Sequence, residues 1–185
     1  MSSFRIRVAA LAVGLIAGNV SAAEFKIDSE SLVGGQFANE QLNGESYGFG
    51  CTGANVSPEI SRSGAPQGTK SYAITLYDND APTGIGWHHW VVVNIPGSQT
   101  SLPKGVASSA ASLPGGAIQT RTDFGVPGYA GACPPAGETH TYTLTVTALK
   151  IATLPINENA TPALVRFFMN ANALAQAKLV IQQAR

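Results

Sequence analysis

Three runs rich in β-branched and aromatic residues, at 71–77, 89–95 and 141–149, constrain the fold more than any other feature of this chain. Such side chains suit the pleated surface of a sheet, so each run predicts a central strand. The last run alternates as expected for a strand with one buried face and one wet face. Its apolar positions are Tyr142, Leu144, Val146 and Ala148, and its polar positions are Thr141, Thr143, Thr145 and Thr147. Weaker strands are expected at 25–29 and 112–120.

One clear helix is expected near the end of the chain. Thr161 is a suitable N-cap and Pro162 suits the first helical position. The apolar residues that recur at helical spacing are Leu164, Phe167, Phe168, Ala171, Leu174 and Ala175. A last short strand is expected at 178–182. Because long helices do not alternate with strands, the pattern predicts a mainly β fold of two packed sheets with one or two helices towards the C-terminus.

The first 23 residues have the pattern of a secretory signal peptide. Arg5 and Arg7 precede an apolar run at 8–18, and small residues follow at 21–23. The run of about 11 residues is well short of the roughly 20 that a membrane-spanning helix needs, so a membrane anchor is the less favoured alternative. We therefore expect residues 1–23 to be removed and the protein to be periplasmic or secreted.

The remaining residues, 24–185, are expected to form one compact domain, because no linker, charge run or repeat divides them. The whole chain has 11 basic and 11 acidic residues. Removal of Arg5 and Arg7 leaves nine basic residues and a net charge of about −2. A basic surface for nucleic acid is therefore not expected.

The chain has two cysteines, Cys51 and Cys133. In an exported protein, oxidising conditions favour a disulfide between them, and two free thiols or a metal pair are the alternatives. In a chain-entropy treatment, closing a loop of about 80 residues stabilises a fold by roughly 4 kcal/mol. The bridge would join the segment before Asn55 to the loop that carries Pro134 and Pro135.

All three histidines lie in two polar segments, 77–90 and 133–142. His88 and His89 are adjacent, so in a strand they point to opposite faces and only one of them can share a pocket with His140. This parity argues against a three-histidine zinc site, and no metal-binding motif is present. No G-x-S-x-G sequence marks a nucleophilic serine, so we assign neither a metal site nor a catalytic residue.

Asp78 and Asp80 follow the first central strand two residues apart, on the same side of an extended chain. This position allows one of them to reach a histidine. The alternative is that both cap the turn at Pro82 and Gly84. A carboxylate beside a histidine suits a pocket for an anionic or hydrogen-bonding ligand.

Several short motifs together resemble the phosphatidylethanolamine-binding protein family, also called Raf kinase inhibitor-like proteins, in its secreted bacterial branch. The resemblance covers most of the mature chain. The motifs are Asn55-Val56-Ser57-Pro58, 65–74, Asp78-Asn79-Asp80-Ala81-Pro82, 87–96 with its Trp87-His88-His89-Trp90 start, 131–135, and His140-Thr141-Tyr142.

The resemblance implies a central antiparallel sheet packed on a smaller sheet, with a small pocket for phosphate-like groups or phospholipid headgroups. Carried over motif by motif, the ligand-binding residues are Asp78, Asp80, Trp87, His89, Pro135, His140 and Tyr142, with His88 in support. Asn79 stands where the family commonly has proline, and little chain follows 178–182, so a more open pocket mouth is expected than in animal members.

The expected function is a periplasmic or secreted protein that binds a small anionic ligand, with no cofactor and no enzymatic activity. The family name suggests an alternative, in which the protein inhibits or modulates another protein. A third class is a hydrolase that uses a histidine and an Asp as acid and base. Bacterial relatives also suggest a homodimer.

Overall fold

The computed structural model describes residues 23–106 and 113–185, so the predicted signal peptide lies outside the described part of the chain except for residue 23. The strands in chain order are β1 (Lys26–Asp28), β2 (Leu32–Val33), β3 (Gln36–Phe37), β4 (Ile60–Ser63), β5 (Ser71–Asp78), β6 (Trp87–Pro96), β7 (Ser101–Leu102), β8 (Ile118–Gln119), β9 (Thr139–Leu149) and β10 (Ala173–Ala184). The described helices are the 3-10 turns η1 (Asn39–Gln41) and η2 (Glu45–Tyr47), and the α-helix α1 (Pro162–Asn172).

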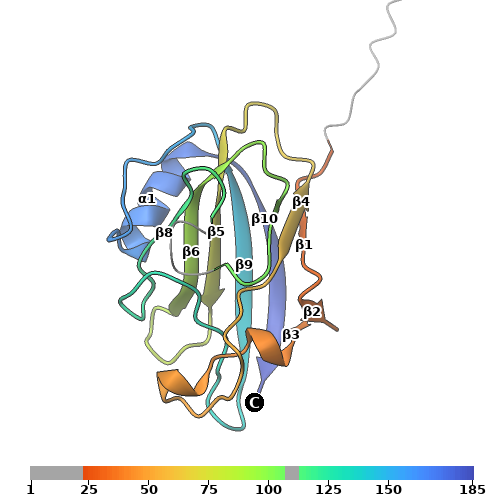
Figure 1. The fold of residues 1–185 in the computed structure, drawn as a ribbon, viewed down its shortest axis with the longest axis vertical. Helices are drawn as coiled ribbons and strands as arrows, with labels where there is room; N and C mark the ends of the chain where they lie inside the picture. The colour runs from red at the N-terminus through yellow and green to blue at the C-terminus, as the bar shows by residue number, and fades with distance from the viewer. Residues whose placement is uncertain (1–22, 107–112) are drawn as a thin grey trace, which may run out of the picture.

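Five antiparallel strands form the central sheet, in the order β10-β9-β5-β6-β8. A smaller sheet, β1-β4-β7, packs on one of its faces, and α1 lies on the other (Figure 1). Strands β2 and β3 form a separate short hairpin. The mainly β prediction, with a central antiparallel sheet packed on a smaller one, is confirmed.

Two apolar clusters bury the two faces of the central sheet. The larger cluster lies between the sheets and contains Trp90 and Leu144 opposite Ile60. The smaller cluster lies beneath α1 and contains Val165 and Met169. Because both faces are covered along much of their length, the central strands carry nearly continuous apolar sequence rather than strict alternation.

The helix begins as predicted but differs in its end and in its buried face. The Thr161 side chain accepts a hydrogen bond from the backbone N–H of Leu164, and Pro162 occupies the first turn. The helix ends at Asn172, because Ala173 already pairs with β9. Predicted inward residues Leu164 and Phe167 are 45% and 67% exposed, because Val165 and Met169, one turn apart, face the sheet instead.

The prediction of a fully wet threonine face on β9 is wrong for half of the strand. Thr145 and Thr147 are buried, because α1 and the segment around Leu154 cover this end of the sheet. Thr141 and Thr143 remain partly exposed.

Three strand boundaries also differ from the predictions. β10 is longer than the expected 178–182, because it pairs with β9 over nearly its full length. Of the expected strand at 112–120, residue 112 lies outside the described part, and only Ile118–Gln119 pairs, with β6. β1 falls inside the expected 25–29.

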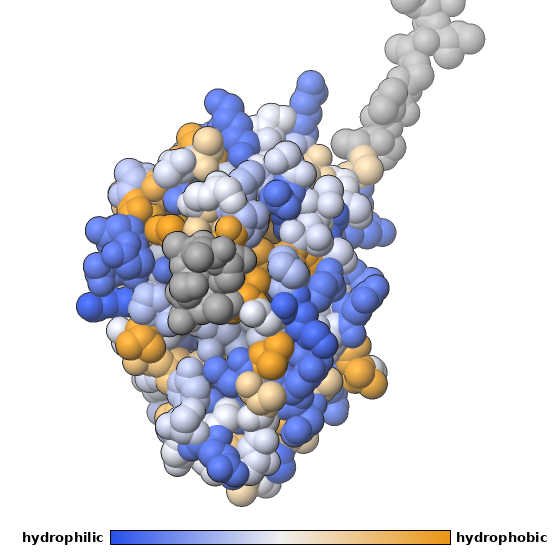
Figure 2. Space-filling view, viewed as in Figure 1, coloured by the Kyte–Doolittle hydropathy of each residue, from blue (hydrophilic) through white to orange (hydrophobic). Residues whose placement is uncertain are grey.

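The surface carries scattered apolar side chains rather than one continuous apolar face on the side drawn in Figure 2. Within the described residues, no helix has the length and apolar character needed to cross a membrane. The most exposed of the large apolar residues are Ile85 at 82%, Val33 at 69% and Phe167 at 67%.

Candidate functional site

The register of the central strands brings three predicted site residues together. Asp78, the last residue of β5, pairs with Tyr142 of β9 on one side and with Trp87 of β6 on the other. β5 is the middle strand of the sheet, so its last carboxylate lies between side chains of both neighbouring strands. Asp78 and Tyr142 are only 3% and 1% exposed.

A β-bulge turns His89 toward Asp78. Leu76 pairs with Trp90 while Tyr77 pairs with His88, so His89 is the extra residue of β6 at this point. A bulge of this kind redirects one side chain without ending the strand. His89 therefore faces Asp78 and Tyr142, while His88 lies on the opposite face of the sheet, as the parity of adjacent residues predicts.

These side chains line a cavity of about 240 Å³ at the end of the sheet. Six of the seven predicted ligand-binding residues lie in its wall, namely Asp78, Trp87, His89, Pro135, His140 and Tyr142. The seventh, Asp80, does not line the cavity. Its carboxylate accepts a 2.6 Å hydrogen bond from the backbone N–H of Thr141, so Asp80 caps the turn. Hydrogen bonding to Thr141, with a smaller contribution from the charge of His140, holds the pKa of Asp80 below its ordinary value.

Asp78 both caps a turn and reaches a histidine, so the two alternatives left by the sequence apply together. Its Oδ1 accepts the backbone N–H of Asp80 at 2.9 Å. Its Oδ2 lies 2.7 Å from Nδ1 of His140. Both side chains of this pair are 5% exposed, so their interaction is little screened by solvent.

His140 is held between two carboxylates. Nε2 of its ring lies 3.2 Å from the carboxylate of Glu138, which is 58% exposed at the edge of the site. Burial by itself would lower the pKa of His140, but the hydrogen bonds and charges of Asp78 and Glu138 outweigh it and raise the pKa. His140 is therefore the histidine that most readily carries a positive charge in this cavity.

The pKa of His89 is shifted in the opposite direction. Burial lowers its pKa, although Ala130 and Asp78 oppose the shift. Nδ1 lies 2.9 Å from the carbonyl oxygen of Ala130, and Nε2 lies 4.0 Å from Oδ2 of Asp78. A neutral ring must donate its Nδ1–H to this carbonyl, which leaves Nε2 as an acceptor on the cavity side.

Asn55 fixes the segment 129–131, whose Ala130 carbonyl oxygen contacts His89. The Asn55 carboxamide accepts a hydrogen bond from the backbone N–H of Gly131 at 2.7 Å and donates to the carbonyl oxygen of Tyr129 at 3.0 Å. Asn55 has a positive φ of 54°, a conformation that asparagine tolerates better than most residues. These contacts set the position of Ala130 and hence of the His89 ring.

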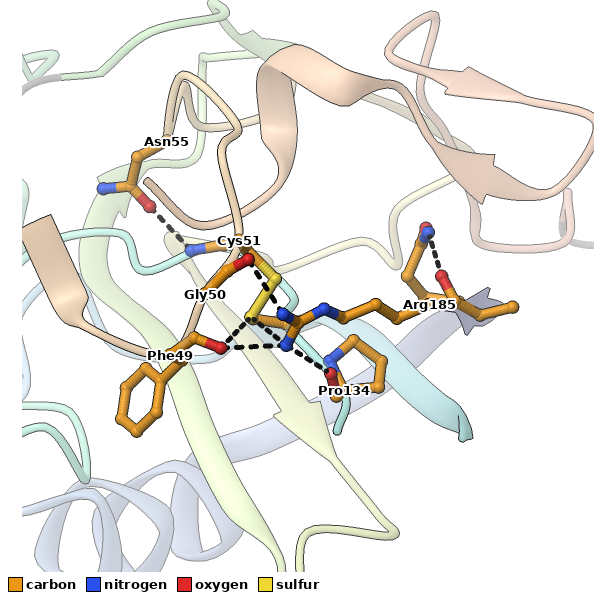
Figure 3. The surroundings of a disulfide bond; sticks show 10 residues. Phe49, Gly50, Cys51, Asn55, Pro134 and Arg185 are labelled. Carbon is orange, nitrogen blue, oxygen red and sulfur yellow. Dashed lines mark hydrogen bonds between the residues drawn. A yellow bond between two sulfur atoms is a disulfide. The ribbon is translucent and has the colours of Figure 1, made fainter. Parts of the chain in front are cut away.

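A disulfide joins the two loops at the edge of the cavity. Cys51 and Cys133 are bonded, which confirms the predicted pairing. Figure 3 shows the Arg185 guanidinium against this bridge, where it donates to the carbonyl oxygens of Phe49 and Gly50, both at 2.8 Å, and of Pro134 at 3.3 Å. The bridge and Arg185 together hold Phe49 and the Pro134–Pro135 turn in the cavity wall.

The wall residues that the sequence analysis did not assign to the site include Phe124, Phe49 and Asn43. Phe124 packs edge-on against His89 and Trp87, at ring-centroid distances of 5.4 and 5.3 Å. Phe49 and the buried Asn43 also line the cavity, and the Asn43 carboxamide has no hydrogen-bond partner within the described residues. All three lie in irregular segments remote in sequence from the histidines, and no local motif marks them.

The hydroxyl groups in the described part of the cavity wall belong to Tyr142 and Thr83. Burial and the Asp78 charge raise the pKa of Tyr142, so its phenol stays neutral. The Thr83 hydroxyl donates to the carbonyl oxygen of Gly86 at 2.7 Å. Within residues 23–106 and 113–185, no group of three or more His, Cys, Asp or Glu side chains has the arrangement of a metal site.

Comparison with known proteins shows what the chain as a whole resembles. A family model described as phosphatidylethanolamine-binding protein matches residues 35–183. UPF0098 protein YbcL of Escherichia coli (strain K12) is 45% identical over 171 residues, which are 90% of this chain and 91% of the relative. UPF0098 protein YbhB of the same organism is 49% identical over 132 residues, 71% of this chain and 84% of the relative.

Two solved structures share the fold. The crystal structure of E. coli YbcL, described as a new member of the mammalian PEBP family, superimposes with a TM-score of 0.82 at 44% identity over 88% of this chain and 99% of that one. The structure of CT736 from Chlamydia trachomatis, a putative phosphatidylethanolamine-binding protein homolog, gives a TM-score of 0.72 at 25% identity over 89% and 99%.

Proposed function

Because the chain belongs to the phosphatidylethanolamine-binding protein family, we propose that it is a small-ligand binding protein whose site is the cavity around Asp78, His89 and His140. The ligand is a phosphate-like anion, either free or as part of a phospholipid headgroup. The observation that carries the proposal is the burial of two histidines and a carboxylate at the base of one cavity with largely apolar walls. Such polar groups would orient a charged group that the apolar walls shield from water.

The hydrogen bonds of the histidines indicate how an anion would be accommodated. The neutral His89 presents Nε2 without a proton, so an anion gains a donor there only if His89 takes up a proton. His140, with its raised pKa, already balances the Asp78 charge. Anion binding should therefore be coupled to proton uptake, and affinity should fall as pH rises.

Calorimetric titration tests this coupling. Glycerophosphoethanolamine is a suitable probe, because its phosphodiester charge does not change between about pH 5.5 and about pH 8. We expect tighter binding at the lower pH and net proton uptake, measured in two buffers of different ionisation enthalpy. The variants His89→Ala and His140→Ala should each weaken binding at least about tenfold.

His88→Gln is the matched control, because His88 lies on the opposite face of the sheet and should leave this binding unchanged. Affinity that rises with pH, or that is insensitive to His89→Ala and His140→Ala, would contradict the proposal.

We propose binding rather than catalysis, because none of the described residues in the cavity wall is an activated nucleophile. Its hydroxyl groups belong to Tyr142, whose pKa is raised, and Thr83, which is engaged by Gly86. Cys133 is in a disulfide. A histidine and Asp78 would still be able to activate water, so turnover of phosphodiester or carboxylic ester substrates that is lost in His89→Ala would overturn this part of the proposal.

The proposed location is the periplasm or the extracellular space. The signal-peptide pattern of residues 1–23 and the Cys51–Cys133 bridge both favour an oxidising compartment. Cell fractionation followed by N-terminal sequencing should find the protein outside the cytoplasm with a new N-terminus near residue 24. A cytoplasmic protein with an intact N-terminus would contradict this location.

A second candidate function, modulation of another protein, is favoured by apolar residues around the cavity. Phe49 lies in its wall and is 55% exposed, while Ile85 and Val126 are 82% and 56% exposed on loops that also contribute Thr83 and Phe124. A purified partner that loses binding to Ile85→Ser but not to His89→Ala would support this function. Partner binding that needs His89 would return the role to the small-ligand cavity.

A further inference from the structure

A second cavity, of about 190 Å³, lies on the other face of the central sheet, beside α1. Thr75, Thr143 and Thr145, from β5 and β9, line it, and the Thr143 hydroxyl accepts a hydrogen bond from the Asn79 carboxamide at 2.9 Å. Arg166 of α1 and Lys178 of β10 also line it. Two cationic side chains from different elements thus border a surface of hydroxyl donors.

The charged side chains that line this cavity are basic. None of its described lining residues is acidic, and the nearby Asp123 carboxylate is engaged by the His88 ring at 3.0 Å. Within the described segments, neither Arg166 nor Lys178 forms an ion pair with a carboxylate. Unneutralised cations at the edge of a concave polar surface attract anions, and threonine hydroxyls can donate to several anionic oxygens at once.

Helix packing explains why the cavity exists. Val165 and Met169 of α1 cover the part of the sheet that carries the smaller apolar cluster. Beyond that contact the helix presents Arg166 and Asn170, one turn apart, toward the polar part of the sheet. The polar part of the sheet is thus covered by charged and amide groups instead of apolar ones, so the space between them suits a polar occupant.

The second cavity is separate from the proposed ligand site. Alternating residues of the same strands line the two cavities, with Tyr77 on one face and Asp78 on the other, and likewise Thr143 and Tyr142. The sheet itself therefore separates them, and occupancy of one does not block access to the other.

We propose that the cavity bordered by Arg166 and Lys178 is a second binding site, selective for a small divalent oxyanion that both cations can contact. The oxyanion is either inorganic or the terminal phosphate or sulfate group of a small organic ester. This inference goes beyond the proposed function, since it needs neither Asp78 nor the histidines of the first cavity.

Backbone and side-chain NMR of the oxidised mature protein tests the proposal, with inorganic phosphate, sulfate and glycerol 3-phosphate as probes at about pH 7.5, where phosphate is largely divalent. The expected result is a saturable set of shifts at Thr75, Thr143 and Thr145. Tighter binding of glycerol 3-phosphate than of phosphate would identify the ligand as an organic ester. Equal binding of the two would identify it as an inorganic ion. Arg166→Gln and Lys178→Gln should each weaken this binding about tenfold.

Lys150→Gln is the matched control, because Lys150 is an exposed lysine directly after β9 that does not line the cavity. His140→Ala should remove ligand-induced NMR shifts around Tyr142 and leave those around Thr143. This result would distinguish binding in the second cavity from binding in the first. Absence of saturable shifts at Thr75, Thr143 and Thr145 with millimolar anion would overturn the inference. Shifts there that persist unchanged in the Arg166→Gln, Lys178→Gln double variant would overturn it as well.

Discussion

The two cavities on either face of the central sheet are built from neighbouring residues of the same strands. The first takes Asp78 and Tyr142, and the second takes Tyr77 and Thr143. The first contains the Asp78–His140 pair, in which both side chains are 5% exposed, and the second is bordered by Arg166 and Lys178, which form no ion pair within the described residues. Alternation along a strand therefore lets one short stretch of sequence supply two sites of different electrostatic character.

The cavities also differ in what holds them in shape. The first depends on loops that a disulfide, Arg185 and Asn55 fix in place. The second depends on the packing of α1 against the sheet through Val165 and Met169. Changes to one support should therefore leave the other cavity intact, and the predictions below exploit this difference.

Removal of the disulfide should lower the free energy of unfolding more than any other change predicted here. The Cys51→Ser, Cys133→Ser double variant should lose about 4 kcal/mol in the free energy of unfolding, because the bridge closes a loop with a sequence separation of 82. Denaturant unfolding measures the loss. Ligand binding in the first cavity should weaken while anion binding beside α1 persists. A stability change below about 1 kcal/mol would contradict the structural role given to the bridge.

Asp78→Asn should lower stability by about 3 kcal/mol, because it removes the charge that pairs with His140 in a buried environment. The pKa of His140 should fall, since Asp78 is the main cause of its increase. Thermal unfolding and NMR titration measure the two effects. Asp80→Asn is the matched control and should cost about 1 kcal/mol or less, because Asp80 only caps an exposed turn.

Met169→Ala should lower stability by about 2 kcal/mol, because it leaves a void between α1 and the sheet. It should also disturb the second cavity and spare the first. Phe167→Ala, two residues away and 67% exposed, should change stability by less than about 0.5 kcal/mol. Equal effects of the two substitutions would show that the helix packs through a different face.

The histidines should titrate on opposite sides of their ordinary value. NMR of the ring protons should place the pKa of His140 above about 6.5 and the pKa values of His88 and His89 below it. The stability that His140 contributes is present at low pH and is lost as pH rises through its folded pKa. The stability that the neutral His88 and His89 contribute is present above about pH 6.5. It is lost as pH falls through their folded pKa values. A common pKa for all three would contradict the separate environments described here.

The sequence predicted the parts of the site that regular strands position. Alternation placed His140 and Tyr142 on one face, and adjacency placed His88 and His89 on opposite faces. The bulge that turns His89 toward Asp78 arises from pairing between β5 and β6, and a single strand carries no signal for it.

Long-range packing accounts for the parts that were missed. Phe124 and Asn43 reach the wall through loops that only the tertiary fold brings together. The buried face of α1 was predicted from the longest apolar pattern, whereas the shape of the sheet beneath it selects Val165 and Met169. The same packing buries Thr145 and Thr147, which alternation alone assigns to a wet face.

The central claim is that the cavity around His89 and His140 binds a phosphate-like anion. The most direct test is a crystal structure of the oxidised mature protein grown with saturating glycerophosphoethanolamine. The account predicts the phosphate group inside this cavity, with an oxygen within hydrogen-bond distance of Nε2 of His89. A ligand seated elsewhere, with this cavity occupied by water alone, would contradict the claim.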